Sequence, residues 1–206
     1  MFLLGPLRPR YLHEIDGGLS LDPAACTSDL ARFRSLTERA GATLEELEQA
    51  LGLYTGPFLA GFESAIEDGA ALYGEWLQEQ RRTWETACRA ARYRLAELAA
   101  QTQGRLALGI AACDALLADE PEREEVHRLK MRLLALGGQR TAALKQYDQC
   151  TAALLDELGV PPSAETNALY DQIVSGEVGP QATGAGKEPA ATQAPFQAPT
   201  PAAHFV

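Results

Sequence analysis

The chain has 206 residues, of which 46% are hydrophobic, 22% charged and 7% aromatic, an ordinary composition for a globular domain. This length predicts one domain with, at most, a short appendage. The formal net charge of −10 argues against direct nucleic-acid binding by this chain, because phosphate binding relies on clustered Lys and Arg.

Cysteine and histidine positions indicate neither a disulfide framework nor a metal site. The four cysteines lie far apart without a C-x-x-C pair, and we interpret them as small core residues in a reducing cytosol. His13, His127 and His204 are scattered and show no metal-ligand spacing. The first apolar run, Phe2–Leu4, is too short for a signal peptide or a membrane span. We therefore expect a cytoplasmic protein without a cofactor.

Residues 1–21 contain several Gly and Pro and show no helical period, which predicts an irregular N-terminal segment. Leu3-Leu4 and Tyr11-Leu12 are candidate short extended pieces, with Asp16-Gly17-Gly18 as a turn. A segment of this kind does not fold alone. It either packs on the residues C-terminal to it or is the trailing edge of something upstream.

From about Ser28 the apolar residues recur at helical spacing, and Gly41 is expected to end the first helix. Thr43 and Glu46 form a capping-box pattern at the start of the second helix. A proline-free stretch from about Gly69 to Thr102 predicts one long helix. Further helices are expected at about 105–118, 122–136, 140–158 and 163–174, with Gly159 in a left-handed cap before Pro161-Pro162.

A repeat lies inside residues 104–159. Gly104 recurs as Gly138 after 34 residues, and Ile110 and Asp114 recur at the same spacing as Leu144 and Asp148. This period is typical of tetratricopeptide (TPR) helical hairpins, which stack to bury their apolar faces. The sequence thus predicts an all-α, TPR-like array of helical hairpins, an α-α superhelix of about seven helices. The array is expected at 22–176, followed by a disordered Pro/Ala/Gly-rich tail at 177–206.

No catalytic motif stands out. The sequence holds no phosphate-binding glycine loop, no G-x-S-x-G and no H-E-x-x-H. The carboxylate pairs Glu45-Glu46 and Glu124-Glu125 lie at expected helix starts, where the helix dipole favours them. In the aromatic loop at 54–62 we expect Phe58 and Phe62 to fill the core, a ligand pocket being the alternative. We therefore predict that the chain is not an enzyme.

The long helix carries a group of arginines that we expect on one of its faces. Arg81, Arg89 and Arg92 fall near one of its faces by helical spacing. They form either a solvated face paired with neighbouring Glu and Asp, or a contact for an acidic partner or phosphates. We name these three as candidate partner-binding residues.

Motifs spread over about residues 19–174 resemble the bacterial transcriptional activator domain, a helical module that follows a winged-helix DNA-binding domain in antibiotic regulatory proteins. The resemblance rests on Leu19–Pro23, on the loop Leu53–Phe62, on Trp76-Leu77 with Arg81-Arg82, on Pro121 with His127–Leu129, and on Gln146-Tyr147 with Glu157–Pro162. The motif residues expected to shape the fold are Tyr54, Gly56, Pro57, Phe58, Trp76, Pro121, Tyr147 and Gly159.

The resemblance implies a regulatory role: self-association or binding of a protein partner, relayed to a DNA-binding part. No winged helix precedes the module in this sequence, and Tyr11–Leu21 looks like the connection leaving one. Two alternatives remain open. One is a stand-alone TPR-like adaptor for a peptide or protein with no role in transcription, and the other is an enzyme or small-ligand receptor.

Overall fold

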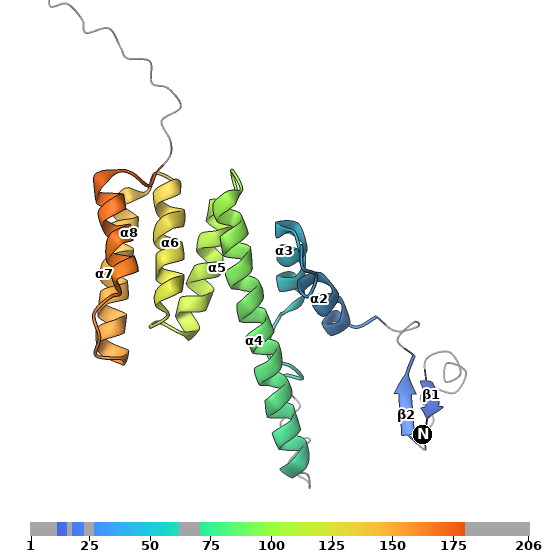
Figure 1. The fold of residues 1–206 in the computed structure, drawn as a ribbon. Helices are drawn as coiled ribbons and strands as arrows, with labels where there is room; N and C mark the ends of the chain where they lie inside the picture. Colours follow the sequence, from blue (N-terminus) through green and yellow to red (C-terminus); the bar gives the residue numbers. More distant parts are fainter. Residues whose placement is uncertain (1–11, 16–17, 23–26, 62–70, 180–206) are drawn as a thin grey trace, which may run out of the picture.

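The computed structural model describes residues 12–15, 18–22, 27–61 and 71–179, without the side chains of the hairpin strands and of residues 71 and 72. A two-stranded hairpin precedes a row of helices in it (Figure 1). The elements are β1 Leu12–Ile15, β2 Gly18–Leu21, α2 Asp29–Thr37, α3 Leu44–Leu53, α4 Ala71–Gln101, α5 Leu106–Asp119, α6 Glu124–Leu136, α7 Arg140–Glu157 and α8 Ala164–Ser175. The predicted TPR-like helical fold is confirmed, with seven helices in the described ranges.

The hairpin forms where extended pieces were expected around Tyr11-Leu12. β1 and β2 pair antiparallel, with Leu12 opposite Leu21 and Ile15 opposite Gly18. Of the predicted turn, Asp16 and Gly17 lie outside the described residues, as do Leu3-Leu4 and Tyr11. In Figure 1 the hairpin backbone stands apart from the row of helices, beyond α2.

The second helix begins at the predicted capping box, and the first begins just after Ser28, where the helical pattern was expected to start. The Ser28 hydroxyl accepts from the Ala31 amide, and Thr43 and Glu46 complete the capping box in both directions. α2 ends at Thr37, earlier than the expected stop at Gly41. The Thr37 hydroxyl donates to the carbonyl of Phe33 and occupies an acceptor of that last turn.

The 34-residue spacing corresponds to a structural repeat. Gly104 joins α4 to α5 with φ of +77°, and Gly138 joins α6 to α7 with φ of +74°. A residue with a side chain adopts this left-handed conformation only with strain, so glycine at both positions lets each hairpin close in the same way. α4, α6 and α8 consequently run in one direction and α5 and α7 in the other (Figure 1).

The core along the array has two parts. The larger part lies among α2 to α6 and includes Phe33, Leu47, Trp84 and Leu116, all buried. A smaller part lies among α6, α7 and α8 around Met131, Leu169 and Ile173. The ring of Phe33 meets Trp84 edge-on with centroids 6.1 Å apart, which ties α2 to the middle of α4.

α5 crosses α4 at a very short distance because residue 109 has no side chain. A Cβ atom on Gly109 would lie 2.8 Å from the Cβ of Ala99 and 3.1 Å from Leu133. This crossing brings α6 close enough to touch α4 as well as α5. It thereby sets the spacing between α4 and α6, the helices that form two walls of the candidate site.

The C-terminal part of the array ends as predicted. Gly159 adopts φ of +69° after α7, and Ser163 caps α8 by accepting from the Thr166 amide. Gly176 ends α8 in a left-handed conformation, after which Val178 packs on the smaller part of the core. The expected tail boundary at 177 therefore falls within described residues, whereas 180–206 lie outside them.

Candidate functional site

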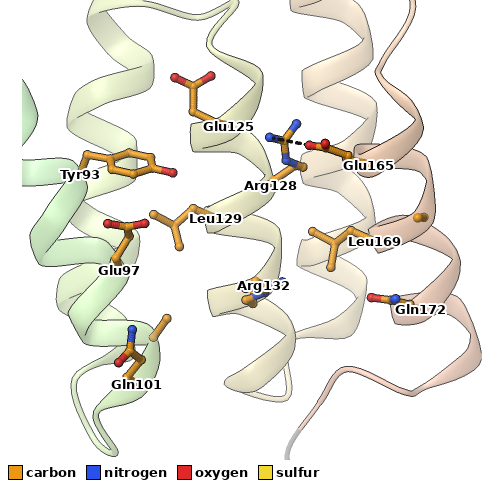
Figure 2. A pocket seen from close by; sticks show the side chains of 12 residues that line it. Tyr93, Glu97, Gln101, Glu125, Arg128, Leu129, Arg132, Glu165, Leu169 and Gln172 are labelled. Carbon is orange, nitrogen blue, oxygen red and sulfur yellow. Dashed lines mark ion pairs between the residues drawn. The ribbon is translucent and has the colours of Figure 1, made fainter.

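A groove of about 510 Å³ lies between α4, α6 and α8 (Figure 2). α6 is its central wall, since Glu125, Arg128, Leu129 and Arg132 follow the spacing that places residues on one helical face. Leu129 and the buried Leu169 supply apolar lining, and most of the remaining side chains are polar. The groove is lined by Tyr93, Glu97, Ala100, Gln101, Glu125, Arg128, Leu129, Arg132, Glu165, Ala168, Leu169 and Gln172.

One end of the groove is neutralised by contacts within the chain. Arg128 approaches Glu165 at 3.2 Å and Glu124 at 3.8 Å, and its guanidinium donates to the Thr166 hydroxyl at 3.3 Å. Glu125 accepts from the Arg123 guanidinium at 2.7 Å, just beyond the groove. The charges at this end are therefore already paired.

Glu124 joins the start of α6 to the start of α8. Its carboxylate accepts from the Ser163 amide at 2.7 Å and from the Thr166 hydroxyl. Burial by itself would raise the pKa of Glu124, but the hydrogen bonds from Thr166 and Ser163 outweigh it and hold the pKa below its usual value. Glu124 thus braces the groove in addition to its expected place at a helix start.

The opposite end of the groove carries polar side chains that are not used within the fold. The side chains of Glu97, Gln101, Arg132 and Gln172 form no hydrogen bond or ion pair with any residue that the structure describes. Gln101 projects from α4, Arg132 from α6 and Gln172 from α8, all at the same end in Figure 2. Within the described chain, one cation and two amides are consequently available to a ligand there, with one anion, Glu97, on the α4 wall.

A second cavity of about 610 Å³ lies on another side of α4 and is lined by Tyr54, Pro57, Glu85, Cys88, Arg89, Arg92, Ala118 and Asp119. Arg89 pairs with Glu120 at 3.4 Å, and its guanidinium also donates to the Thr86 hydroxyl. Arg92 forms no hydrogen bond or ion pair within the described ranges. Carboxylates and guanidiniums are mixed in this cavity, so its lining does not select ligands of one charge.

Of the three candidate arginines of the long helix, Arg89 and Arg92 line this second cavity and Arg81 does not. Arg81 donates to the carbonyls of Phe58 and Leu59 at 2.9 and 3.1 Å and so holds the aromatic loop. Leu59 needs this support because its φ of +51° lies in the left-handed region. Arg89 is paired with Glu120, a contact that Arg92 lacks among the described residues. A role for the three arginines in binding a partner stays a prediction.

His127 is buried and both of its ring nitrogens are in contact with polar groups. Nε2 lies 2.8 Å from the Pro121 carbonyl, which can only accept, and Nδ1 lies 2.6 Å from the Gln146 amide. Burial is the main cause that lowers the pKa of His127, which favours the neutral ring. Through these two contacts His127 links the turn before α6 to α7. Sequence reasoning named both residues but not their contact.

Residues 21–174 match the family described as the bacterial transcriptional activator domain. The chain belongs to this family. Among solved structures it is similar to Mycobacterium tuberculosis EmbR in complex with a low affinity phosphopeptide, with 23% identity, a TM-score of 0.59 and 84% of this chain covered. The likeness covers 47% of that chain, so this sequence spans about half its length. No curated protein matches the sequence.

The family motifs lie at the joints of the activator domain. Tyr54 caps α3, Gly56 and Pro57 follow it in the loop, and Phe58 meets the ring of Trp76 edge-on at 6.0 Å. Phe58 is half-buried against the core as expected, and Phe62 lies outside the described residues. That Tyr54, Gly56, Pro57 and Phe58 shape the fold stays a prediction.

The C-terminal motifs brace α7 and α8. The Tyr147 hydroxyl donates to the Asn167 side chain at 2.6 Å, and its ring lies 4.4 Å from that of Tyr170. Pro121 supplies the carbonyl that His127 contacts, and Gly159 makes the turn toward α8.

No helix in the described part of the chain has the length and apolar character needed to cross a membrane.

The chemistry of the cysteines agrees with a packing role in the activator domain. Cys88, Cys113 and Cys150 are buried and free, whereas Cys26 lies outside the described residues. Burial raises the pKa of Cys113 to about 12 and that of Cys150 to about 11, so both remain thiols at neutral pH. In the described ranges no group of three His, Cys, Asp or Glu side chains is placed to hold a metal ion.

Proposed function

We propose that this chain is a non-enzymatic protein-interaction module of a bacterial transcription regulator. The partner is another protein or a second copy of the chain, and its binding changes how an attached or cognate DNA-binding part is presented. The family membership supports the regulatory role. We place the partner in the α4–α6–α8 groove and the protein in the cytoplasm, and with a net charge of −10 we expect no direct nucleic-acid contact.

The observation that carries the proposal is the unused polar end of the groove. The polar side chains there are exposed, so their polar groups are accessible to a partner that enters the groove. Here Gln101, Arg132 and Gln172 come from three different helices, beside the apolar Leu129 and Leu169. Amides suit the backbone of an extended peptide, and the guanidinium suits a carboxylate.

Two features support a role other than catalysis. The buried thiols of Cys113 and Cys150 have raised pKa values and are poor nucleophiles. The ring of His127 uses both nitrogens in contacts that hold α6 and α7 together. None of these groups lines the groove.

The regulatory role can be tested in the source bacterium by measuring transcript levels. Deletion of the coding region for residues 27–179 is expected to change the transcripts of a defined set of genes. Arg132→Glu is expected to reproduce that change, whereas the control Arg82→Glu, an exposed arginine of α4 outside the groove, leaves the transcripts unchanged. Unaltered transcripts after the deletion would refute the regulatory role.

The oligomeric state separates the two kinds of partner. Light scattering after size exclusion should give a dimer mass that Arg132→Glu reduces to a monomer if the partner is a second copy. A monomer with an intact transcript response indicates a different protein. A winged-helix coding region in frame upstream of Met1 favours the regulator over the alternative, a stand-alone TPR-like adaptor.

A further inference from the structure

We propose that the chain's own segment around Lys187-Glu188 occupies the α4–α6–α8 groove and competes there with the partner. This inference names a regulator of the site proposed above and therefore rests on that site. Glu188 would meet Arg132 on α6, and Lys187 would meet Glu97 on α4. Three observations carry the proposal: where the chain leaves the fold, how far it reaches, and how its charges match.

The chain leaves the helical array beside the unused end of the groove. After Gly176 turns the chain, Val178 packs on the core part that contains Met131 and Ala135 of α6. Gly179 comes next, and a Cβ atom there would lie 3.9 Å from the Ala135 carbonyl oxygen. Ala135 is one helical turn from Arg132, a rise of about 5 Å. The described chain therefore ends at Gly179 beside the C-terminal end of α6, the end at which Arg132 lies.

The length of the segment is sufficient to enter the groove. Lys187 lies eight residues after Gly179, and eight extended residues span at most about 26 Å. The groove face of α6 from Glu125 to Arg132 rises only about 10 Å. The segment can thus reverse its direction and reach Arg132 with residues to spare.

The charges of the segment match those of the groove. Lys187 and Glu188 are the only Asp, Glu, Lys or Arg residues in 180–206, and they are adjacent. Pro189 follows, and the residue before a proline favours an extended backbone. Adjacent residues of an extended chain point to opposite sides. Lys187 and Glu188 would therefore face opposite walls, as Glu97 on α4 and Arg132 on α6 require.

Tethering makes such a contact effective although its two ion pairs are weak. Two exposed ion pairs alone give a Kd no tighter than about 30 mM, and two hydrogen bonds from the Gln101 and Gln172 amides to the backbone of the segment would bring it to about 1 mM. A short flexible linker, however, supplies an effective concentration in the millimolar range. A contact with a Kd of about 1 mM is therefore about half occupied within one chain, and a partner that binds more tightly displaces it.

The test measures binding of a fluorescent peptide of residues 180–195 to the chain that ends at Gly179, by fluorescence anisotropy. We expect saturable binding, at least fivefold weaker with Arg132→Glu and unchanged with Arg82→Glu. The full chain should bind the same peptide about twofold more weakly than the shortened chain, because its own segment occupies the groove in about half of the molecules. Circular dichroism of each variant checks that the fold is retained.

A charge exchange distinguishes a specific contact from general attraction. A peptide carrying Glu188→Lys should lose affinity for the shortened chain and regain it for Arg132→Glu. The proposal is overturned if the peptide does not bind, or if full and shortened chains bind it equally. The proposed function fails separately, since it depends on the transcript response. Loss of that response in Arg132→Glu without peptide binding would assign the groove to a partner alone.

Discussion

The close crossing of α4 and α5 predicts opposite effects of one substitution at two helical glycines. In Gly109→Ala the new Cβ would lie 2.8 Å from the Cβ of Ala99, well inside the usual 3.5–4.0 Å between carbon atoms. The Ala99 methyl cannot rotate away, so the helices must separate. In Gly52→Ala the new Cβ on α3 meets nothing within 4 Å.

The magnitudes result from two competing effects. Alanine in place of a helical glycine stabilises by up to about 1 kcal/mol at either site. Overpacking at residue 109 costs about 1–3 kcal/mol. Gly52→Ala should therefore raise the free energy of unfolding by up to about 1 kcal/mol, and Gly109→Ala should lower it by about 1 kcal/mol. The free energies of unfolding of the two variants should therefore differ by about 2 kcal/mol. Because the gain in helix propensity is the same at both sites, this difference measures the steric cost at residue 109.

Urea unfolding followed by circular dichroism measures both variants against the parent chain. The separation corresponds to about 4–8 °C in melting temperature for a domain of this size. Ala99→Gly added to Gly109→Ala should recover part of the loss, because it removes the opposing methyl, and the two changes should not be additive. If Gly109→Ala unfolds at the same urea concentration as Gly52→Ala, or at a higher one, the close crossing is wrong.

Three further predictions concern groups whose pKa values the fold shifts. The fold lowers the pKa of His127 below 6.5, so as the pH falls the unfolded chain binds a proton at this residue before the folded chain does. The stability that His127 contributes should therefore be complete above pH 6.5 and decrease as the pH drops below it. The free energy of unfolding of His127→Gln, measured across pH 5–8, should lack this decrease. Glu124→Ala should lower the free energy of unfolding by about 1–3 kcal/mol, because it leaves two donors at the start of α8 unpaired. The control Glu165→Ala, which removes an exposed ion pair, should lower it by less than about 1 kcal/mol. Equal losses in urea unfolding would contradict the role of Glu124 in joining α6 to α8. Cys113 and Cys150 should react with a thiol reagent only after denaturant is added, and rapid labelling of either in the native protein would show that its burial is wrong.

The candidate site illustrates where reasoning from sequence stopped. The three arginines were named from their spacing on the long helix. In the structure Arg81 braces a loop and Arg89 pairs with Glu120, contacts that depend on segments distant in the chain. The groove residues were missed because they come from three helices. A usable signal was present: Glu125, Arg128, Leu129 and Arg132 lie at the spacing of one helical face that is mostly polar.

Helix starts and turns are local features, and the sequence alone was enough to predict them. The caps at Thr43 and Ser163, and the glycines at 104, 138 and 159, act through their own backbone neighbours. The 34-residue period and the motifs then indicated the array and its family. Which side chains are used within the fold depends instead on tertiary contacts. Arg128 and Arg132 occupy the same face of α6, but the start of α8 brings Glu165 to Arg128, whereas no described carboxylate reaches Arg132.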